Sequence, residues 1–354
     1  MKRLVICSDG TWNTPSQMDR GDRTPSNIVK IARTVLPQDA AGVPQVVFYD
    51  PGVGNGNWLE RLTGGAFGKG LSQNVQDNYH FLLHNFVPGD EIYCFGFSRG
   101  AYTARSTAGL IRKCGLLRKE HAWRVPEAYD LYRNSAEGPD SDASIRFRKE
   151  FSVETRIWFI GVFDTVGALG IPISFLRRFT KHRYEFHDVE LSRSVRYAYH
   201  AVAIDERRSQ FAPTLWNTKP EEDQVVEQVW FPGVHSNIGG GYQDSGLSDI
   251  ALLWMIEKAK AAGLAFDDAH LARLAVPNPL GELRDSRTGF FKWLRQVWRP
   301  IGEQERGQES VHESAFVRRA ADLEYHPPNL EQFAMRTNPN RPSPIATENV
   351  TVDP

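Results

Sequence analysis

The chain has 354 residues, of which 41% are hydrophobic and 24% are charged, a composition typical of a globular protein built on one large domain. Its 42 basic and 43 acidic residues give a formal net charge of −1, which excludes a general basic field for nucleic acid. The three cysteines have no CxxC spacing, and Cys7 and Cys94 lie in apolar runs, so we expect buried thiols in a reducing compartment.

We expect no targeting signal at the N-terminus. The apolar run 4–7 directly follows Lys2 and Arg3 and is too short for the core of a signal peptide. No apolar stretch approaches the ~20 residues that span a membrane. We therefore expect a soluble, cytoplasmic protein, unless a specialised secretion system exports it.

The first part of the chain alternates between strand-like and helix-like segments. The pattern predicts strands at 4–7 and 45–49, and helices at 27–35, capped by Ser26, and at 71–86. The glycine-rich stretch 50–70 matches neither a dinucleotide fingerprint nor a phosphate loop, and we interpret it as a mobile loop over a site. The alternation favours an α/β fold with a mostly parallel sheet.

The strongest local signal is a strand that ends in Gly96-x-Ser98-x-Gly100 and leads into a helix predicted over 102–117. This is the nucleophile-elbow pattern, in which glycines permit a sharp turn that exposes the serine hydroxyl. It predicts Ser98 as a nucleophile. The backbone N–H of Arg99, with a second N–H from Gly10 or Thr11 after the first strand, would stabilise an oxyanion.

Two later strand ends provide an acid and a base. The apolar run that begins at Arg156 places Asp164 at its end, and the strand 225–231 leads into a glycine-rich loop that carries His235. The order Ser, acid, His is that of α/β-hydrolases, and it predicts a serine ester hydrolase that works through an acyl-enzyme. Competing candidates are His200 for the base, within a helix predicted over 195–204, and Asp188, Asp205, Asp244 and Asp249 for the acid.

The remaining segments complete a single catalytic domain over 1–340 with a flexible tail at 341–354. We interpret 118–150 and 171–200 as insertions or lid segments. Within the second, apolar and basic residues of 171–190 interleave, which suits a solvated amphipathic helix or a peripheral membrane contact. The other expectations are an ion-paired helix end at 205–208, a helix over 249–262 capped by Ser248, irregular structure past 265, and packing of the aromatic-basic cluster 290–299 onto the core.

Several blocks, taken in order, resemble one protein family. They are SDGTWN (8–13), GFSRGAYTAR (96–105), VFDTVGALG (162–170), HAVAIDERRSQFAPTLW (200–216), WFPGVHSNIGGGY (230–242), LSDIALLWMI (247–256) and DSRTGFF (285–291). They are similar to an α/β-hydrolase family once catalogued as a domain of unknown function, which includes bacterial type VI secretion phospholipase effectors. The resemblance covers about residues 3 to 330.

The resemblance implies an α/β-hydrolase fold with inserted segments. It implies Ser98 as nucleophile, Asp164 as acid and His235 as base, acting on fatty-acyl esters such as phospholipids. An inhibitor or immunity partner is implied if the chain is an effector. We expect no cofactor, no metal and no nucleic-acid partner.

Two alternatives from other classes remain open at this point. One is a catalytically silent hydrolase scaffold that binds a partner and leaves Ser98 unreactive toward fluorophosphonates. The other is a metal-dependent phosphoesterase in which Asp9 and Asp50, each just after an early strand, hold a divalent ion. That enzyme would lose activity with a chelator and survive Ser98→Ala.

Overall fold

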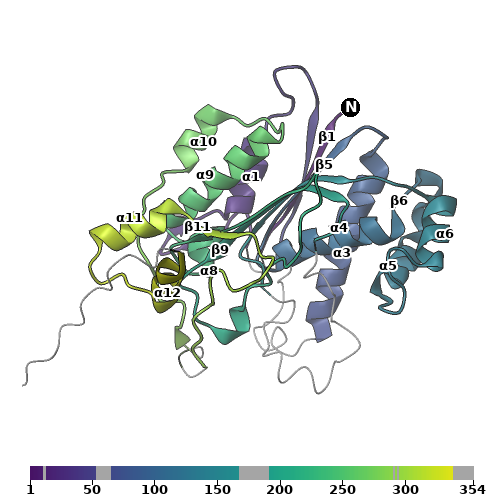
Figure 1. The fold of residues 1–354 in the computed structure, drawn as a ribbon. Coiled ribbons are helices and arrows are strands. Elements are labelled where there is room, and N and C mark those ends of the chain that lie inside the picture. Colours follow the sequence, from purple (N-terminus) through teal and green to yellow (C-terminus); the bar gives the residue numbers. More distant parts are fainter. Residues whose placement is uncertain (11–12, 53–64, 167–190, 290–291, 293–294, 338–354) are drawn as a thin grey trace, which may run out of the picture.

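A computed structural model describes residues 1–10, 13–52, 65–166, 191–289, 292 and 295–337, with only the backbone at 65–69. In these residues a seven-stranded sheet runs in the order β11-β10-β9-β8-β5-β1-β4, and every neighbouring pair is parallel (Figure 1). Its strands are β1 Arg3–Ser8, β4 Gln45–Asp50, β5 Glu91–Phe97, β8 Ile157–Phe163, β9 Val195–Ala203, β10 Val225–Phe231 and β11 Glu309–Val311. Two short antiparallel pairs lie outside the sheet: β2 Met18–Asp19 with β3 Asp22–Arg23, and β6 Leu116–Leu117 with β7 Ser152–Val153.

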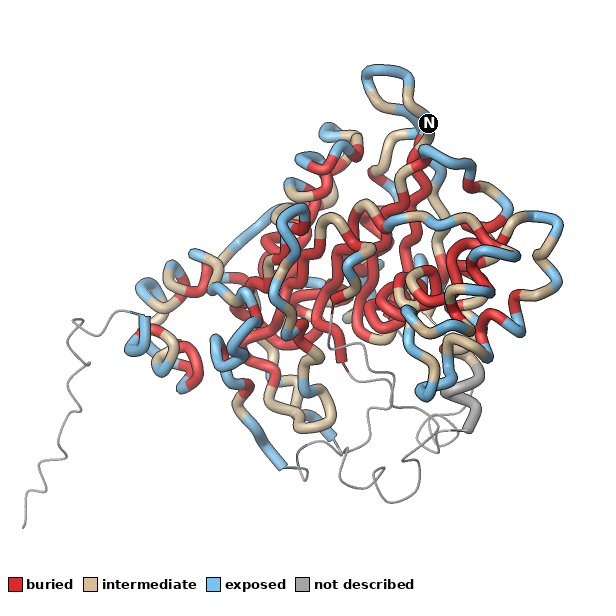
Figure 2. The backbone as a smooth tube through the Cα atoms, turned by 45° about the vertical axis from the view of Figure 1, so that its right-hand side comes forward, coloured by how far each residue is buried: buried red, intermediate tan, exposed pale blue. Residues whose placement is uncertain are grey.

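The inner strands β1, β5 and β8 are buried on both faces because their apolar side chains alternate between two cores. In β1, Leu4 and Ile6 join one core cluster and Val5 and Cys7 join the other. Successive side chains of a strand point to opposite faces, so a continuous apolar run contributes side chains to both cores. Figure 2 shows the result as a buried band through the middle of the molecule. The fold is therefore a three-layer sandwich of helices, sheet and helices.

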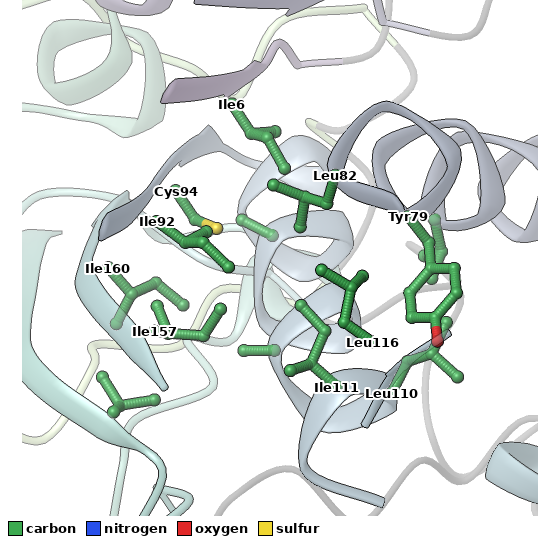
Figure 3. Packing of buried hydrophobic residues seen from close by; sticks show 14 of the residues in the cluster. Ile6, Tyr79, Leu82, Ile92, Cys94, Leu110, Ile111, Leu116, Ile157 and Ile160 are labelled. Carbon is green, nitrogen blue, oxygen red and sulfur yellow. The ribbon is translucent and has the colours of Figure 1, made fainter. Parts of the chain in front are cut away.

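The helices divide between the two faces. The first core is covered by α3 Gly65–Asn85, α4 Arg99–Cys114, α5 Val125–Arg133 and α6 Asp142–Phe151. Figure 3 shows this packing, with Leu82 and Ile111 from the helices against Ile92 and Ile160 from the strands. The opposite core is covered by α1 Asn27–Thr34, α8 His235–Gly239, α9 Gly246–Ala261 and α10 Asp268–Leu274.

A third, smaller cluster joins the end of the chain to the sheet. It contains Val202 and Trp230 from β9 and β10, together with Ala315 of α11 Glu313–Ala321 and Leu330 of α12 Pro328–Thr337. In its described residues, the segment past residue 265, which sequence patterning describes as irregular, thus contains α10, α11, α12 and the edge strand β11. These elements were not predicted because they are only three to ten residues long and are separated by many turn residues.

The expected strands at 4–7, 45–49 and 225–231 and the helices at 27–35 and 71–86 are confirmed, with Ser26 capping α1 through a bond from the Val29 N–H. The helix expected at 195–204 is wrong: this segment is β9, in the middle of the sheet. Alanine and arginine favour a helix here, but the chain lies between β8 and β10, and such tertiary context overrides propensity. Residues 195–200 therefore belong to the sheet and not to a lid.

Other expectations differ in detail. The elbow helix α4 begins at Arg99, before the expected residue 102, and ends at Cys114. The α9 helix begins at Gly246, so its N-cap is Ser245 and not Ser248. The segment 118–150 contains a 3₁₀ turn, Lys119–Arg124, followed by α5 and α6.

The expected lid residues 171–190, most of the loop 50–70 and the tail 341–354 lie outside the described residues. Among the described helices, none is long and apolar enough to cross a membrane. Cys7, Cys94 and Cys114 are all buried and none forms a disulfide.

Candidate active site

The turn between β5 and α4 holds Ser98 in a conformation that few residues adopt. Its φ and ψ angles are 56° and −118°, and its N–H donates to the Phe163 carbonyl of β8 at 3.0 Å. A Cβ on Gly96 would lie 2.4 Å from the Gly100 carbonyl oxygen, and one on Gly100 would lie 2.1 Å from the Ser8 carbonyl oxygen. Only glycine allows these close approaches, so the two glycines of the motif fix the turn and place Ser98 at its tip.

The neighbouring strand brings Asp164 beside the serine. Phe97 pairs with Phe163 in the parallel register of β5 and β8, so Ser98 and Asp164 leave the sheet side by side. Asp164 also has a positive φ, 40°. Non-glycine residues with positive φ are uncommon and concentrate at functional sites, and this site contains two of them.

His235 reaches the same point from the far side of β9. The sequence predicts that His235 lies in a loop after β10. In the structure this loop is shorter, because His235 is already the first residue of the five-residue helix α8. Its N–H donates to Glu206 Oε2 at 3.3 Å, and the Gly233 N–H donates to Asp205 Oδ2 at 2.6 Å. These bonds tie the turn after β10 to the segment after β9.

The three predicted residues form one hydrogen-bonded chain. His235 Nε2 lies 2.8 Å from Ser98 Oγ, and His235 Nδ1 lies 2.6 Å from Asp164 Oδ2. The carboxylate can only accept, so Nδ1 carries the ring proton and Nε2 is left to accept the serine proton. The exposed fractions are 8%, 5% and 0% for Ser98, His235 and Asp164, so these three hydrogen-bonded side chains are shielded from bulk water. This is the arrangement that nucleophilic attack by a serine requires.

A buried arginine completes the surroundings of Asp164. Arg299 Nη1 donates to Oδ1 at 2.6 Å, and Arg299 Nη2 donates to Oδ2 at 3.0 Å; the Ala203 N–H adds a bond to Oδ1 at 3.0 Å. Burial alone would raise the pKa of Asp164, but the Arg299 guanidinium and His235 outweigh it and hold the pKa well below its usual range. These two partners therefore favour the carboxylate form of Asp164.

Burial lowers the pKa of His235 below its ordinary value, against the opposing attraction of Asp164. Two aromatic rings provide that burial. Phe97 lies with its ring centroid 4.7 Å from the imidazole, and the Phe211 ring meets it edge-on at 5.0 Å. A neutral imidazole at neutral pH is the form that can act as a base.

His200, the competing candidate for the base, makes hydrogen bonds within and beside the sheet. It lies in β9 with no exposed surface; its Nε2 accepts the Thr165 N–H at 3.1 Å, and its Nδ1 lies 3.3 Å from Gln228 Oε1. Burial lowers the pKa of His200 to about 3. Both ring nitrogens are thus engaged by described residues away from Ser98.

The oxyanion candidates lie at the same end of the sheet. Arg99 is the first residue of α4, so its amide is at the positive end of that helix. The Gly10 amide donates to Asp9 Oδ1 at 2.7 Å, so this N–H points at a carboxylate and not at the space beside Ser98 Oγ. Thr11 lies outside the described residues.

Asp9 and Asp50, the residues of the metal-dependent alternative, lie at the ends of adjacent strands: Asp9 follows β1, and Asp50 is the last residue of β4. Asp9 Oδ2 accepts from Ser26 Oγ at 2.6 Å and from Tyr49 Oη at 2.8 Å, so protein donors satisfy its carboxylate. Burial raises the pKa of Asp9 to about 6 and that of Asp50 to about 7. In the described part of the chain no group of three His, Cys, Asp or Glu side chains is placed to hold a metal ion. The geometry lends this alternative no support.

Sequence patterning misses Arg299 and the contact of Glu206 with the His235 N–H. Arg299 lies in the cluster 290–299, which sequence suggests is core packing, and nothing in its spacing points to Asp164. Glu206 is fully buried and pairs with Arg208 at 2.8 Å, as the sequence indicates for 205–208, although no helix ends there. The sequence order of strand ends identifies Ser98, Asp164 and His235, because each follows a strand directly or by one short turn.

The parallel sheet, its two helical layers and the serine turn define an α/β-hydrolase-like protein. A family model described as "T6SS, Phospholipase effector Tle1-like, catalytic domain" matches residues 2–258. The chain belongs to this family of type VI secretion phospholipase effector domains.

A relative from Saccharomyces cerevisiae, "Uncharacterized protein YEL023C", is 31% identical over 243 residues, which is 62% of this chain and 33% of that protein. This chain thus spans about a third of the length of that relative.

Two solved structures match parts of this chain. The Tle1 effector bound to the VgrG spike of the type VI secretion system has a TM-score of 0.50 and 15% identity, with 78% of this chain and 76% of that chain covered. An uncharacterized protein from Pseudomonas aeruginosa has a TM-score of 0.47 and 17% identity, over 79% of this chain and 49% of that chain. The first likeness supports the fold assignment.

Proposed function

We propose that the protein is a serine hydrolase that cleaves carboxylic esters of lipids. The observation that carries the proposal is the unbroken chain Ser98–His235–Asp164, with distances of 2.8 and 2.6 Å, at the carboxyl ends of parallel strands. Membership of a phospholipase effector family supports a fatty-acyl ester, such as a phospholipid, as the substrate class.

In this mechanism Ser98 Oγ attacks the ester carbonyl while His235 Nε2 takes the hydroxyl proton. Asp164 keeps the proton on Nδ1 and stabilises the imidazolium that forms. The Arg99 N–H and a donor from the Gly10–Thr11 loop stabilise the oxyanion; since the Gly10 amide bonds to Asp9, that second donor requires a change in the loop or comes from Thr11. His235 then gives its proton to the leaving alcohol, and water releases the acyl group by the same steps.

The test is hydrolysis of a p-nitrophenyl ester series of increasing chain length and of a phospholipid vesicle panel. Wild type should cleave, and Ser98→Ala should lose activity by several orders of magnitude. Asp164→Asn should lose roughly 10⁴-fold, because the imidazole would adopt the wrong tautomer. Equal activity of wild type and Ser98→Ala would refute the mechanism, and inactivity of a folded wild type on every ester would favour the silent scaffold.

Two substitutions serve as matched controls. His200→Gln removes a second buried histidine, and Ser135→Ala removes an exposed serine. Neither residue hydrogen-bonds to Ser98, His235 or Asp164 in the described structure, so both variants should keep their activity if they fold. A loss confined to His235→Gln and Ser98→Ala would assign the base and the nucleophile.

Family membership also suggests a biological setting. We propose export by a type VI secretion system, contact with a lipid surface during catalysis, and neutralisation by an inhibitor or immunity partner. The solved Tle1 effector is bound to a VgrG spike. Co-purification of the chain with a VgrG protein encoded in the same genome tests this setting. If cells secrete the chain and no VgrG protein co-purifies with it, the proposed setting is contradicted.

A further inference from the structure

Arg299 is held in place more firmly than an ordinary core arginine. Besides both oxygens of Asp164, its guanidinium bonds to the Ala203 carbonyl at 3.0 Å and to the Phe211 carbonyl, and only 3% of the residue is exposed. Its own carbonyl accepts the amide of Asn329 in α12 at 3.0 Å, and the same amide bonds to the Ile204 carbonyl at 2.9 Å.

This contact joins two parts of the chain that are far apart in sequence. Arg299 and Asp164 are separated by 135 positions, and Arg299 lies beyond residue 258, where the match to the family model ends. Residues 295–337 therefore do more than cover β9 and β10 with α11 and α12. They insert a positive charge beside the carboxylate that contacts His235.

The charge must affect His235 through Asp164. A carboxylate that is hydrogen-bonded to two cations stabilises each of them less than it would stabilise one alone. Among the described residues, the titratable groups that act on the imidazole are Asp164, which directly follows β8, and Glu206 and Arg208 from the segment after β9. Glu206 and Arg208 pair with each other at 2.8 Å, so Asp164 and its second partner Arg299 dominate the balance at Nδ1.

We propose that Arg299 is a positioning residue of the hydrolase: it fixes both oxygens of Asp164 and shares the charge of that carboxylate with His235, so that the imidazole stays a neutral base. The proposal rests on the function proposed above only for its effect on turnover. Its effect on the proton equilibrium of His235 holds whether or not the substrate class is correct.

The experiment compares Arg299→Met, which removes the charge, with Arg299→Lys, which keeps it but cannot bond to both oxygens in the same way. We expect Arg299→Met to move the acid limb of the kcat/KM profile upward by about one pH unit, because Asp164 then acts on His235 alone. Arg299→Lys should leave the limb in place and lower the plateau rate by roughly ten- to hundredfold, as for other groups that orient a catalytic ligand.

Arg148→Met is the matched control. Arg148 is another buried arginine, 7% exposed, and it bonds to the Lys113 and Pro139 carbonyls in the helical layer around α6. Its removal should change stability without moving the acid limb. A limb that stays within about 0.3 pH unit in Arg299→Met, with only stability reduced, would show that Arg299 is purely structural and overturn the proposal.

A direct titration separates this proposal from the proposed function. The imidazole signal of His235, assigned by its loss in His235→Gln, is followed by NMR across pH in the full chain. A higher titration midpoint in Arg299→Met supports the proposal even if wild type cleaves no ester, a result that would count against the function alone. An unchanged midpoint overturns it. If Arg299→Met fails to fold, Arg299→Lys decides: a wild-type plateau rate and midpoint would overturn the proposal.

Discussion

At the scale of single residues, the site concentrates backbone strain and buried charge in two positions. Ser98 and Asp164 both have positive φ angles, and they are linked through His235 and, at Asp164, to Arg299. Such conformations cost on the order of 1–3 kcal/mol each and persist only where the surrounding structure enforces them. Here the bonds from Ser98 N–H to Phe163 and from Asp164 N–H to Ala201 enforce them.

The lowered pKa of His235 gives a prediction about pH. A base must be neutral, so kcat/KM should rise with pH as His235 loses its proton. Because burial lowers this pKa, the midpoint of the acid limb should lie below the ordinary histidine value of about 6.5. A kcat/KM profile from pH 4 to 9 on a short-chain ester measures it. A midpoint above 7 would mean that Asp164 dominates over burial.

At the scale of elements, the site depends on how closely α4 approaches β1. Gly100, in the first turn of α4, lies against the carbonyls of Ser8 and Asp9, and a Cβ there would sit 2.1 and 2.5 Å from their oxygens. Backbone atoms cannot swing aside as a side chain can. The strand-turn-helix unit therefore tolerates no side chain at this position.

Gly100→Ala should cost about 3 kcal/mol of stability or prevent folding, because α4 would have to move away from β1. Gly138→Ala is the control, since a Cβ there meets nothing within 4 Å and its φ is ordinary; it should change stability by less than about 0.5 kcal/mol. Urea unfolding of both variants measures the difference. Similar midpoints for the two would contradict the packing described here.

At the scale of the whole molecule, one buried acid makes stability depend on pH. Asp50, the last residue of β4, is 7% exposed, and its Oδ2 has no hydrogen-bond partner among the described residues. Burial, helped by the negative charges of Asp77 and Asp9, raises its pKa from 3.8 to about 7. The folded state thus holds this proton more tightly than the unfolded state. The stabilisation is full below about pH 4 and is lost as pH rises through about 7.

Asp50→Asn should remove this loss. At pH 8 the variant should be roughly 2–4 kcal/mol more stable relative to wild type than it is at pH 4. The free energy of unfolding, measured by denaturant at several pH values, tests this. Asp130→Asn, at an exposed position of α5, is the control and should follow wild type at every pH. If the free energies of unfolding of the two variants change with pH in the same way, Asp50 is not the source of the pH dependence.

The candidate site was largely predictable from sequence because its three residues follow strands that carry strong local signals. Gly96 and Gly100 flank Ser98, an unbroken apolar run precedes Asp164, and a mostly apolar strand precedes the turn before His235. Arg299 was not predictable, because its role depends on a tertiary contact across 135 positions. Nor was β9, whose alternating aromatic, alanine and arginine residues suit either element until its neighbours in the sheet are known.

The most direct test of the account is covalent labelling of the intact protein with a fluorophosphonate, followed by peptide mass spectrometry. The account predicts one phosphonyl group per chain on the peptide that contains Ser98. Ser98→Ala should abolish labelling, and His235→Gln should slow it by at least a hundredfold, because the base no longer takes the proton. No labelling of folded wild type, or labelling that persists in Ser98→Ala, would contradict Ser98 as the nucleophile.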